Sequence, residues 1–400
     1  MKGRNCSMER VEALIKKYQD TVVEHYHWLH AHPEVSGQEK ETAAYIAAQL
    51  RKMGLEPTEN VGGYGVTAVI KGRGPGKCVG LRADFDALPI QECTGLPFAS
   101  QNPGVMHACG HDTHTAMLLG TAQVLMDLRD TFDGCVKLIF QPSEENSADS
   151  GAKKMIADGA LENPHVDAII GQHINPEKPV GTIGTRVGAD SAASDRFFIT
   201  VEGKSSHASQ PQNGIDTIAV SAQIISALQT IVARNVAPLK SAVVTIGKIS
   251  GGDRYNVLAG RVDMEGTCRN HDPAVRDMIE QRMESIIRGV AEGMGATYTF
   301  RYVRGYSPIM NDKDMIELLC ATASEIIGEE NIEIKPAPGL GGEDFSFFAE
   351  KVPGAFYRMG CHAEGTPIWP AHNEHMVVDP ACFPVGMQIM TESALNYLAK

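Results

Sequence analysis

The chain has 400 residues, of which 43% are hydrophobic and 21% charged, and this allows two globular domains with separate cores. Its formal net charge of −13 argues against a nucleic-acid or anionic-membrane partner, because both favour clustered lysine and arginine. The polar start resembles no signal peptide, and no uninterrupted apolar stretch approaches a membrane span. Nine cysteines without close spacing favour free thiols and a cytoplasmic location, and Cys78, Cys135 and Cys320 are expected to be small core residues.

The first part of the chain alternates strand-like and helix-like patterns. Residues 32–54 predict a loop and an amphipathic helix ended by Gly54, and residues 113–128 predict a buried helix. Strands are expected within residues 66–72, 77–89, 135–145 and 166–173. Strands separated by helices predict an α/β fold with a mostly parallel sheet and helices on both faces. Polar residues fall at the carboxyl ends of these strands, where open α/β sheets place their ligand sites.

The pattern changes after Gly188. Strands are predicted at 195–203, 241–252, 259–270 and 297–306, with helices at 215–234 and 273–295. This βαββαβ order is that of a ferredoxin-like unit with an antiparallel sheet. We therefore expect a domain at residues 188–306 inserted into a discontinuous domain of residues 1–187 and 307–400.

Two metal-ligand types occur close together in the motif MHACGHD. Cys109 and His111 are two positions apart, so a thiolate and an imidazole can face one metal ion, or two if the sulfur bridges. A loop cysteine among incidental histidines is an equally good interpretation of this motif alone.

Adjacent carboxylates follow a strand in the motif FQPSEE. Neighbouring side chains in extended chain diverge, so Glu144 and Glu145 can take different roles. One acid can hold a divalent cation while the other transfers protons for an activated water. A solvated acidic turn is the commoner outcome for such a pair, but the apolar run before it indicates the middle of a sheet.

Further candidates end other predicted strands or lie in loops. His173 ends GQH, and His372 lies in PAHNEH; each alone is equally typical of an edge or loop histidine. Asp84 and Asp86 in RADFDALP are expected to orient ligand histidines or to cap a turn. Several such signals around one predicted sheet favour a shared metal site.

The predicted inserted domain has three residues of interest. His207 lies in SSHASQP, Asn256 in YNVLAG, and Arg269 at a strand end. An arginine at a strand end can bind a carboxylate with two hydrogen bonds, although a surface ion pair is commoner.

Taken together, these motifs resemble the M20 metallopeptidase family, in its amidohydrolase branch of aminoacylases, hippurate hydrolases and auxin-conjugate hydrolases. The resemblance spans nearly the whole chain in the stretches LHAHPEVSGQE, RADFDALP, MHACGHDTHTAMLLG, FQPSEE, GQH, SSHASQP, YNVLAGRVDMEGTCR and GGEDFSFF. The chain departs from the family pattern at Gln212, where relatives often have a second histidine, and after the two glutamates. These departures leave the ligand set intact and bear on substrate preference.

The resemblance implies a catalytic domain interrupted by a lid domain through which homodimers or higher oligomers form. It implies two divalent ions per protomer, Mn²⁺ or Zn²⁺ with Co²⁺ or Ni²⁺ as options, and Glu144 as general base. It implies that His207 stabilises an oxyanion across a dimer and that Asn256 and Arg269 hold the substrate carboxylate. The metal ligands that it implies are Cys109, His111, Glu145, His173 and His372.

The expected activity is metal-dependent hydrolysis of N-acyl amino acids or similar conjugates. A dipeptidase or carboxypeptidase of the same family is the alternative. Two hypotheses of other classes are an amidase with Cys109 as nucleophile, which chelators would not inhibit, and a catalytically silent binding subunit.

Overall fold

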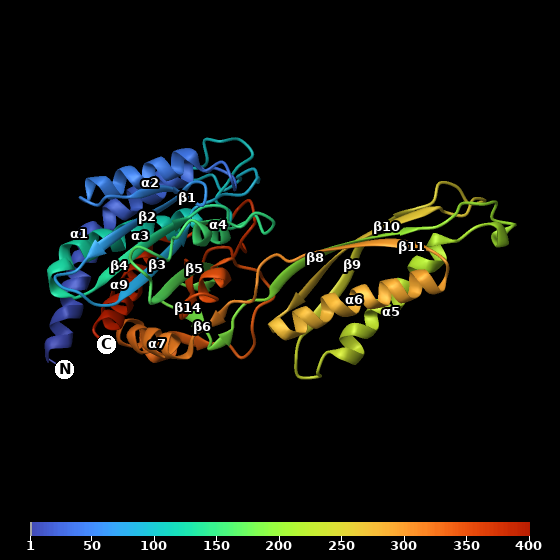
Figure 1. Ribbon diagram of the computed structural model, residues 1–400. Helices are drawn as coiled ribbons and strands as arrows, with labels where there is room; N and C mark the ends of the chain where they lie inside the picture. Colours follow the sequence, from blue (N-terminus) through green and yellow to red (C-terminus); the bar gives the residue numbers. More distant parts are fainter. Residues whose placement is uncertain (1) are drawn as a thin grey trace. The chain divides into compact units, whose positions relative to one another are not determined.

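The computed structural model describes the backbone of residues 2–400 and the side chains from residue 8 onward. The chain divides into two compact units (Figure 1). Each unit has a hydrophobic core of its own. The first unit contains Met1–Asp190, Ile309–Ala337 and Asp344–Lys400, and the second contains Ser191–Pro308 with Pro338–Glu343. The sequence analysis placed residues 338–343 in the first unit; in the structure they pack with the second.

An eight-stranded sheet forms the centre of the first unit. The pairs β3–β4, β3–β5, β5–β14 and β6–β13 are parallel, so the predicted largely parallel sheet is confirmed. The antiparallel pairs are β1–β2, β2–β4 and β6–β14. In spatial order the strands are β1 (Thr58–Val61), β2 (Gly65–Lys71), β4 (Cys135–Gln141), β3 (Cys78–Asp84), β5 (Ala168–Pro179), β14 (Gly354–His362), β6 (Ile183–Thr185) and β13 (Ile332–Ile334).

Helices cover both faces of this sheet. A Cβ on Gly171 of β5 would meet Phe345 of α8, whereas Gln172, the next residue, lies against Gly386 of α9. Successive side chains of a strand point to opposite faces, so α8 and α9 lie on opposite sides. The helices of this unit are α1 (Lys2–Ala31), α2 (Lys40–Lys52), α3 (His111–Leu128), α4 (Gly151–Ala157), α7 (Lys313–Ile327), α8 (Phe345–Ala349) and α9 (Phe383–Leu398); β7 (Gly188–Ala189) and β12 (Met310–Asn311) form a small separate ladder.

The second unit has the βαββαβ order of a ferredoxin-like fold. Its antiparallel sheet has the order β11-β8-β10-β9, and the two helices pack against each other and the sheet. Asp216 and Asp272 cap the helices by accepting hydrogen bonds from backbone N–H groups in the first turns. The elements are β8 (Ala193–Glu202), α5 (Thr217–Asn235), β9 (Ala242–Gly251), β10 (Arg261–Asn270), α6 (Pro273–Gly293) and β11 (Thr297–Val303).

Among the described residues, helix α5 alone is long and apolar enough to cross a membrane by length and composition. Its residues Ile224, Leu228 and Ile231 are buried in the core of the second unit. This packing is what a core helix of a globular domain requires.

Candidate metal centre

The site residues gather where parallel strands end. Strands β3 and β4 are parallel neighbours in register, so the loops after Asp84 and Gln141 leave the same edge of the sheet. The loop after β3 carries Asp86, and the loop after β4 carries the two adjacent glutamates. Glu144 is buried, with 5% of its surface exposed.

Cys109 and His111 are presented by the turn that begins α3. Gly110 between them has φ +84°, and a Cβ there would lie 2.6 Å from Ile174 of β5. Only glycine combines this left-handed conformation with such a close approach. The turn therefore places the thiol and the imidazole directly against β5, which carries His173.

Among five groups of side chains that could each hold a metal ion, three overlapping groups consist only of predicted ligands and Glu144. Within each group the ligand atoms all lie within 4.8 Å of one another. The structure thus brings together the five predicted ligands and Glu144. The groups are Cys109–His111–His173, Cys109–Glu145–His372 and His111–Glu144–Glu145.

Some ligand atoms in these groups are buried and lack a hydrogen-bond partner. His372 Nε2 lies 3.1 Å from Glu145 Oε1, yet this buried oxygen has no partner with hydrogen-bond geometry. His111 Nε2 is also buried and has no hydrogen-bond partner, the nearest carboxylate oxygen, Asp84 Oδ2, being 3.8 Å away. Buried polar atoms without partners are costly, and a cation between them would satisfy both. The donor set of one thiol, three imidazoles and a carboxylate fits a divalent transition metal.

Acidic residues orient the histidines, as the sequence predicted for Asp84 and Asp86. His111 Nδ1 lies 3.1 Å from the Asp86 carboxylate and 2.9 Å from its backbone oxygen. His114 Nδ1 lies 2.6 Å from Asp84 Oδ1, and its Nε2 accepts a hydrogen bond from the N–H of Ile174. Both nitrogens of His114 are therefore occupied, which leaves it a supporting role.

The protonation of two candidate ligands depends on burial. Burial raises the pKa of the Cys109 thiol to about 12, and the negative charge of Glu145 adds to this shift. Burial, followed by the electrostatic effect of His114, lowers the pKa of His173, so the His173 imidazole is neutral. A neutral imidazole can bind metal as it is, whereas the thiol would need a cation to lose its proton.

A buried ionic network beneath the site was not predicted. Arg82 is fully buried and forms ion pairs with Asp84 at 2.6 Å and Asp344 at 2.9 Å. The Asp344 carboxylate also accepts hydrogen bonds from Gln141 and Ser150. The sequence signal for this network was the charged triplet RAD at the end of an otherwise apolar strand. Asp344 lies in the motif GGEDF, and its backbone N–H also donates to Glu144, so both its backbone and its side chain support the site.

The remaining predicted residues lie in the second unit, at opposite ends of its sheet. His207 forms a β-bridge with Val257, next to Asn256, in the loops beyond Glu202 and before Arg261. Arg269 lies near the other end of β10, opposite Ser194 of β8. At about 3.3 Å per residue, roughly 25 Å separates these ends. Within one chain the structure does not bring His207 and Arg269 together.

Comparison with known proteins defines the class of this fold and site. Residues 80–396 match the model of peptidase family M20/M25/M40, so the chain belongs to this family, as predicted. It is 41% identical to an N-acetyl-L-cysteine deacetylase of Bacillus subtilis over 92% of this chain and 86% of the relative. It is 42% identical to an N-acyl-L-amino acid amidohydrolase of Geobacillus stearothermophilus over 76% of this chain and 81% of the relative.

A solved structure shows the same fold. A dinuclear metal-binding peptidase of the M20 family from Bacillus subtilis is 37% identical, with a TM-score of 0.83 covering 96% of this chain and 99% of that one. The family and these relatives identify the chain as a hydrolase of amide bonds, which confirms the expected enzyme class.

Proposed function

We propose that this chain hydrolyses the amide bond of N-acyl amino acids, using two divalent cations held by Cys109, His111, Glu145, His173 and His372. The observation that carries this proposal is the overlap of the three ligand groups, in which Cys109, His111 and Glu145 each belong to two groups. Shared members are what a pair of neighbouring ions requires. The names of the deacetylase and amidohydrolase relatives support an N-acyl substrate.

The ligand types allow more than one metal. The Cys109 thiolate favours zinc, while the imidazoles and the Glu145 carboxylate also tolerate manganese, cobalt or nickel. When bound, the cations would polarise the scissile carbonyl and lower the pKa of a water molecule to about 7.

Glu144 is the proposed general base. Its carboxylate would accept the proton of the attacking water and deliver it to the leaving amine. The backbone N–H of Asp344 donates to Glu144 Oε1 at 3.4 Å, which favours one orientation of this buried side chain. Glu144 also lies with His111 and Glu145 in one group, so the proton transfer would occur beside the ligands.

The two glutamates provide the test of this assignment. We expect Glu144→Gln to abolish turnover of N-acetyl and N-benzoyl amino acids while metal content stays at the wild-type level. Glu145→Gln should lose metal, and Glu12→Gln, an exposed control on α1, should change neither. Metal content would be measured by mass spectrometry on the same samples. Loss of metal from Glu144→Gln would show that the two roles are reversed.

A peptide with a free carboxyl end is the second candidate substrate. A thermostable carboxypeptidase of Saccharolobus solfataricus is 37% identical over 95% of this chain. Hydrolysis rates of the metal-loaded enzyme on a panel of N-acyl amino acids and dipeptides would distinguish these two substrate classes. Chelated enzyme in the same panel tests the cysteine-nucleophile hypothesis, because a reaction through Cys109 would survive removal of the metal.

The lid residues favour a site shared between two chains. Two dications, the thiolate, the two glutamates and hydroxide would leave the site near neutral, so Arg269 would favour a substrate carboxylate. A small substrate cannot span the roughly 25 Å between Arg269 and His207 of one lid. We therefore propose a homodimer in which His207 of a second copy stabilises the oxyanion and Asn256 of that copy contacts the substrate.

We also propose a cytoplasmic location. Its support is that the cysteines from Cys78 onward are free thiols, which suits a reducing compartment. Fractionation of the native cells with an antibody to the chain would test it.

A further inference from the structure

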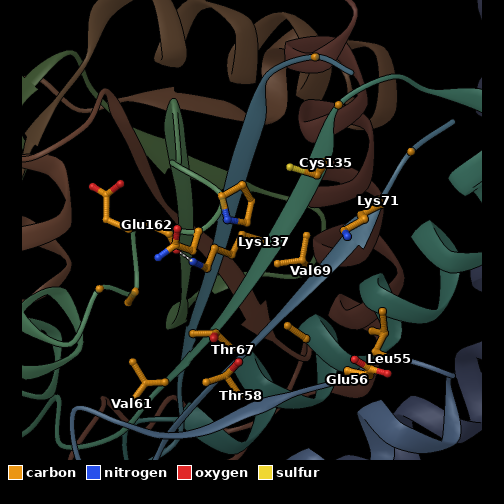
Figure 2. Close-up of a pocket in the computed structure, with 18 of the residues that line it drawn as sticks. Leu55, Glu56, Thr58, Val61, Thr67, Val69, Lys71, Cys135, Lys137 and Glu162 are labelled. Atoms are coloured by element: carbon orange, nitrogen blue, oxygen red, sulfur yellow. Dashed lines mark hydrogen bonds between the residues drawn. The ribbon is translucent and has the colours of Figure 1, made fainter. Parts of the chain in front are cut away.

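A second cavity lies in the first unit, away from the candidate metal centre. Its volume is about 1070 Å³, and it is lined by side chains of β2 and β4 and by the segment 158–164 (Figure 2). Cys135 lines it at the first residue of β4, whereas Glu144 follows the last residue of that strand. At about 3.3 Å per residue, the two ends of β4 are roughly 20 Å apart. The cavity is therefore separate from the ligand cluster.

Cys135 lies between a second thiol and a lysine. On parallel β3 its register partner is Cys78, and on antiparallel β2 its partner is Lys71. Register partners on neighbouring strands point to the same face of the sheet, so these three side chains form one row. Because Cys78 and Cys135 are register partners on adjacent strands, their thiols are neighbours. Sequence analysis treated both as core residues; Cys78 is buried, but Cys135 is half-buried and borders the cavity.

A buried lysine adds positive charge beside this row. Lys137 is two residues beyond Cys135 on the same strand and face, is 3% exposed, and donates to the backbone oxygen of Glu162 (Figure 2). The neighbouring Cys78 thiol, then Lys137 and Lys71, lower the pKa of Cys135 against the opposing effects of burial and Asp167. The Cys135 thiol and burial raise the pKa of Cys78. Reactive cysteines occur in such partly exposed, electropositive surroundings.

We propose that Cys135 and Cys78 form an oxidant-sensitive dithiol, with Cys135 as the attacking thiolate and Cys78 as the resolving thiol. The oxidant is a hydroperoxide such as hydrogen peroxide. The Cys135 sulfur attacks one peroxide oxygen, the O–O bond breaks, and the departing hydroxide takes a proton to become water, leaving a sulfenic acid. The Cys78 sulfur then attacks the Cys135 sulfur, the S–O bond breaks, and a second water leaves with the Cys78 proton.

The strand geometry permits the resulting disulfide. Neighbouring strands are about 4.8 Å apart, which lies within the Cα separations of about 4.4–6.8 Å that disulfides span. Formation of the bond between Cys78 and Cys135 needs no rearrangement of the metal-site loops, because both residues begin their strands.

The test uses the full-length, metal-loaded enzyme treated with limiting hydrogen peroxide and then with an alkylating reagent. Peptide mass spectrometry should show a Cys78–Cys135 disulfide, with Cys135 oxidised roughly tenfold faster than Cys93. Cys93 is exposed, so it controls for access alone. In Cys78→Ser, Cys135 should persist as a sulfenic acid that a 1,3-dione reagent traps.

Two further variants keep the proposal falsifiable if Cys78→Ser folds poorly. Lys137→Met and Lys71→Met retain both thiols and should each slow Cys135 oxidation several-fold. Cys320→Ser, which removes another half-buried thiol, should leave the rate unchanged. Oxidation of Cys93 ahead of Cys135, or a Cys135 sulfenic acid that never becomes a disulfide in the wild type, would overturn the assignment.

Discussion

His111 is held through one nitrogen by a single residue, Asp86. Nδ1 faces both the carboxylate and the backbone oxygen of Asp86, so Nδ1 carries the proton and Nε2 is left for the candidate metal. The same carboxylate accepts hydrogen bonds from the N–H of Glu145 and the hydroxyl of Ser36. Asp86 thus fixes two proposed ligands at once without being a ligand itself.

Removing this support should weaken metal binding. We expect Asp86→Ala to lower metal affinity by about 10- to 100-fold, because His111 and the Glu145 loop lose their shared partner. Competition with a fluorescent chelator would measure the change. Asp133→Ala, which removes an exposed carboxylate, is the control and should bind metal as the wild type does. Unchanged affinity in Asp86→Ala would contradict the positioning role.

The buried Arg82 network should contribute strongly to stability. Arg82→Met leaves Asp84 and Asp344 buried without their cation, which should cost about 3–5 kcal/mol of unfolding free energy. Urea unfolding of the metal-loaded proteins would measure it. The exposed Arg73–Asp133 pair offers a matched control, and Arg73→Met should show no measurable change. Equal effects of the two substitutions would refute the assigned importance of Arg82.

The buried pair of His30 and Asp112 should make stability depend on pH. Burial lowers the pKa of His30, but hydrogen bonds to Asp112 and Glu92 outweigh this and raise it from 6.5 to about 9. Because folding raises this pKa, protonation of His30 stabilises the folded state. This stabilisation is fully present below pH 6.5 and is lost as the pH rises through 9.

Comparison with a His30→Gln variant isolates this contribution. The wild type should be more stable than His30→Gln by up to ~3 kcal/mol near pH 6.5, and the difference should shrink toward pH 9. Denaturant titrations at several pH values in this range would measure it. A difference that stays constant with pH would exclude His30 as the titrating group.

The proposed shared site predicts complementation between two inactive variants. His207→Ala should lower kcat by roughly 100-fold or more through loss of an oxyanion donor, and Glu144→Gln should be inactive. Mixed dimers formed by refolding the two together contain one complete site each, so about a quarter of wild-type activity should return. Separately refolded variants, combined afterwards, are the control. No recovery in mixed dimers would place His207 in the site of its own chain.

The sequence by itself determined the class of fold and the set of candidate ligands. Apolar runs at 78–83 and 135–140 become adjacent parallel strands because both faces of the sheet are covered, which demands continuous burial. Ligand-type residues after those runs identify the site because parallel strands end at one edge. The βαββαβ order was also readable, since its helices and strands have distinct hydrophobic periods.

Tertiary structure decided what depends on contacts distant in the sequence. Arg82 meets Asp344, 262 positions later, and no local pattern specifies that pair. Likewise, only strand register shows that Cys78 adjoins Cys135 and that Arg269 lies far from His207 within one lid. Local periodicity records which face of an element is buried, whereas the partner on that face is fixed by packing of the whole chain.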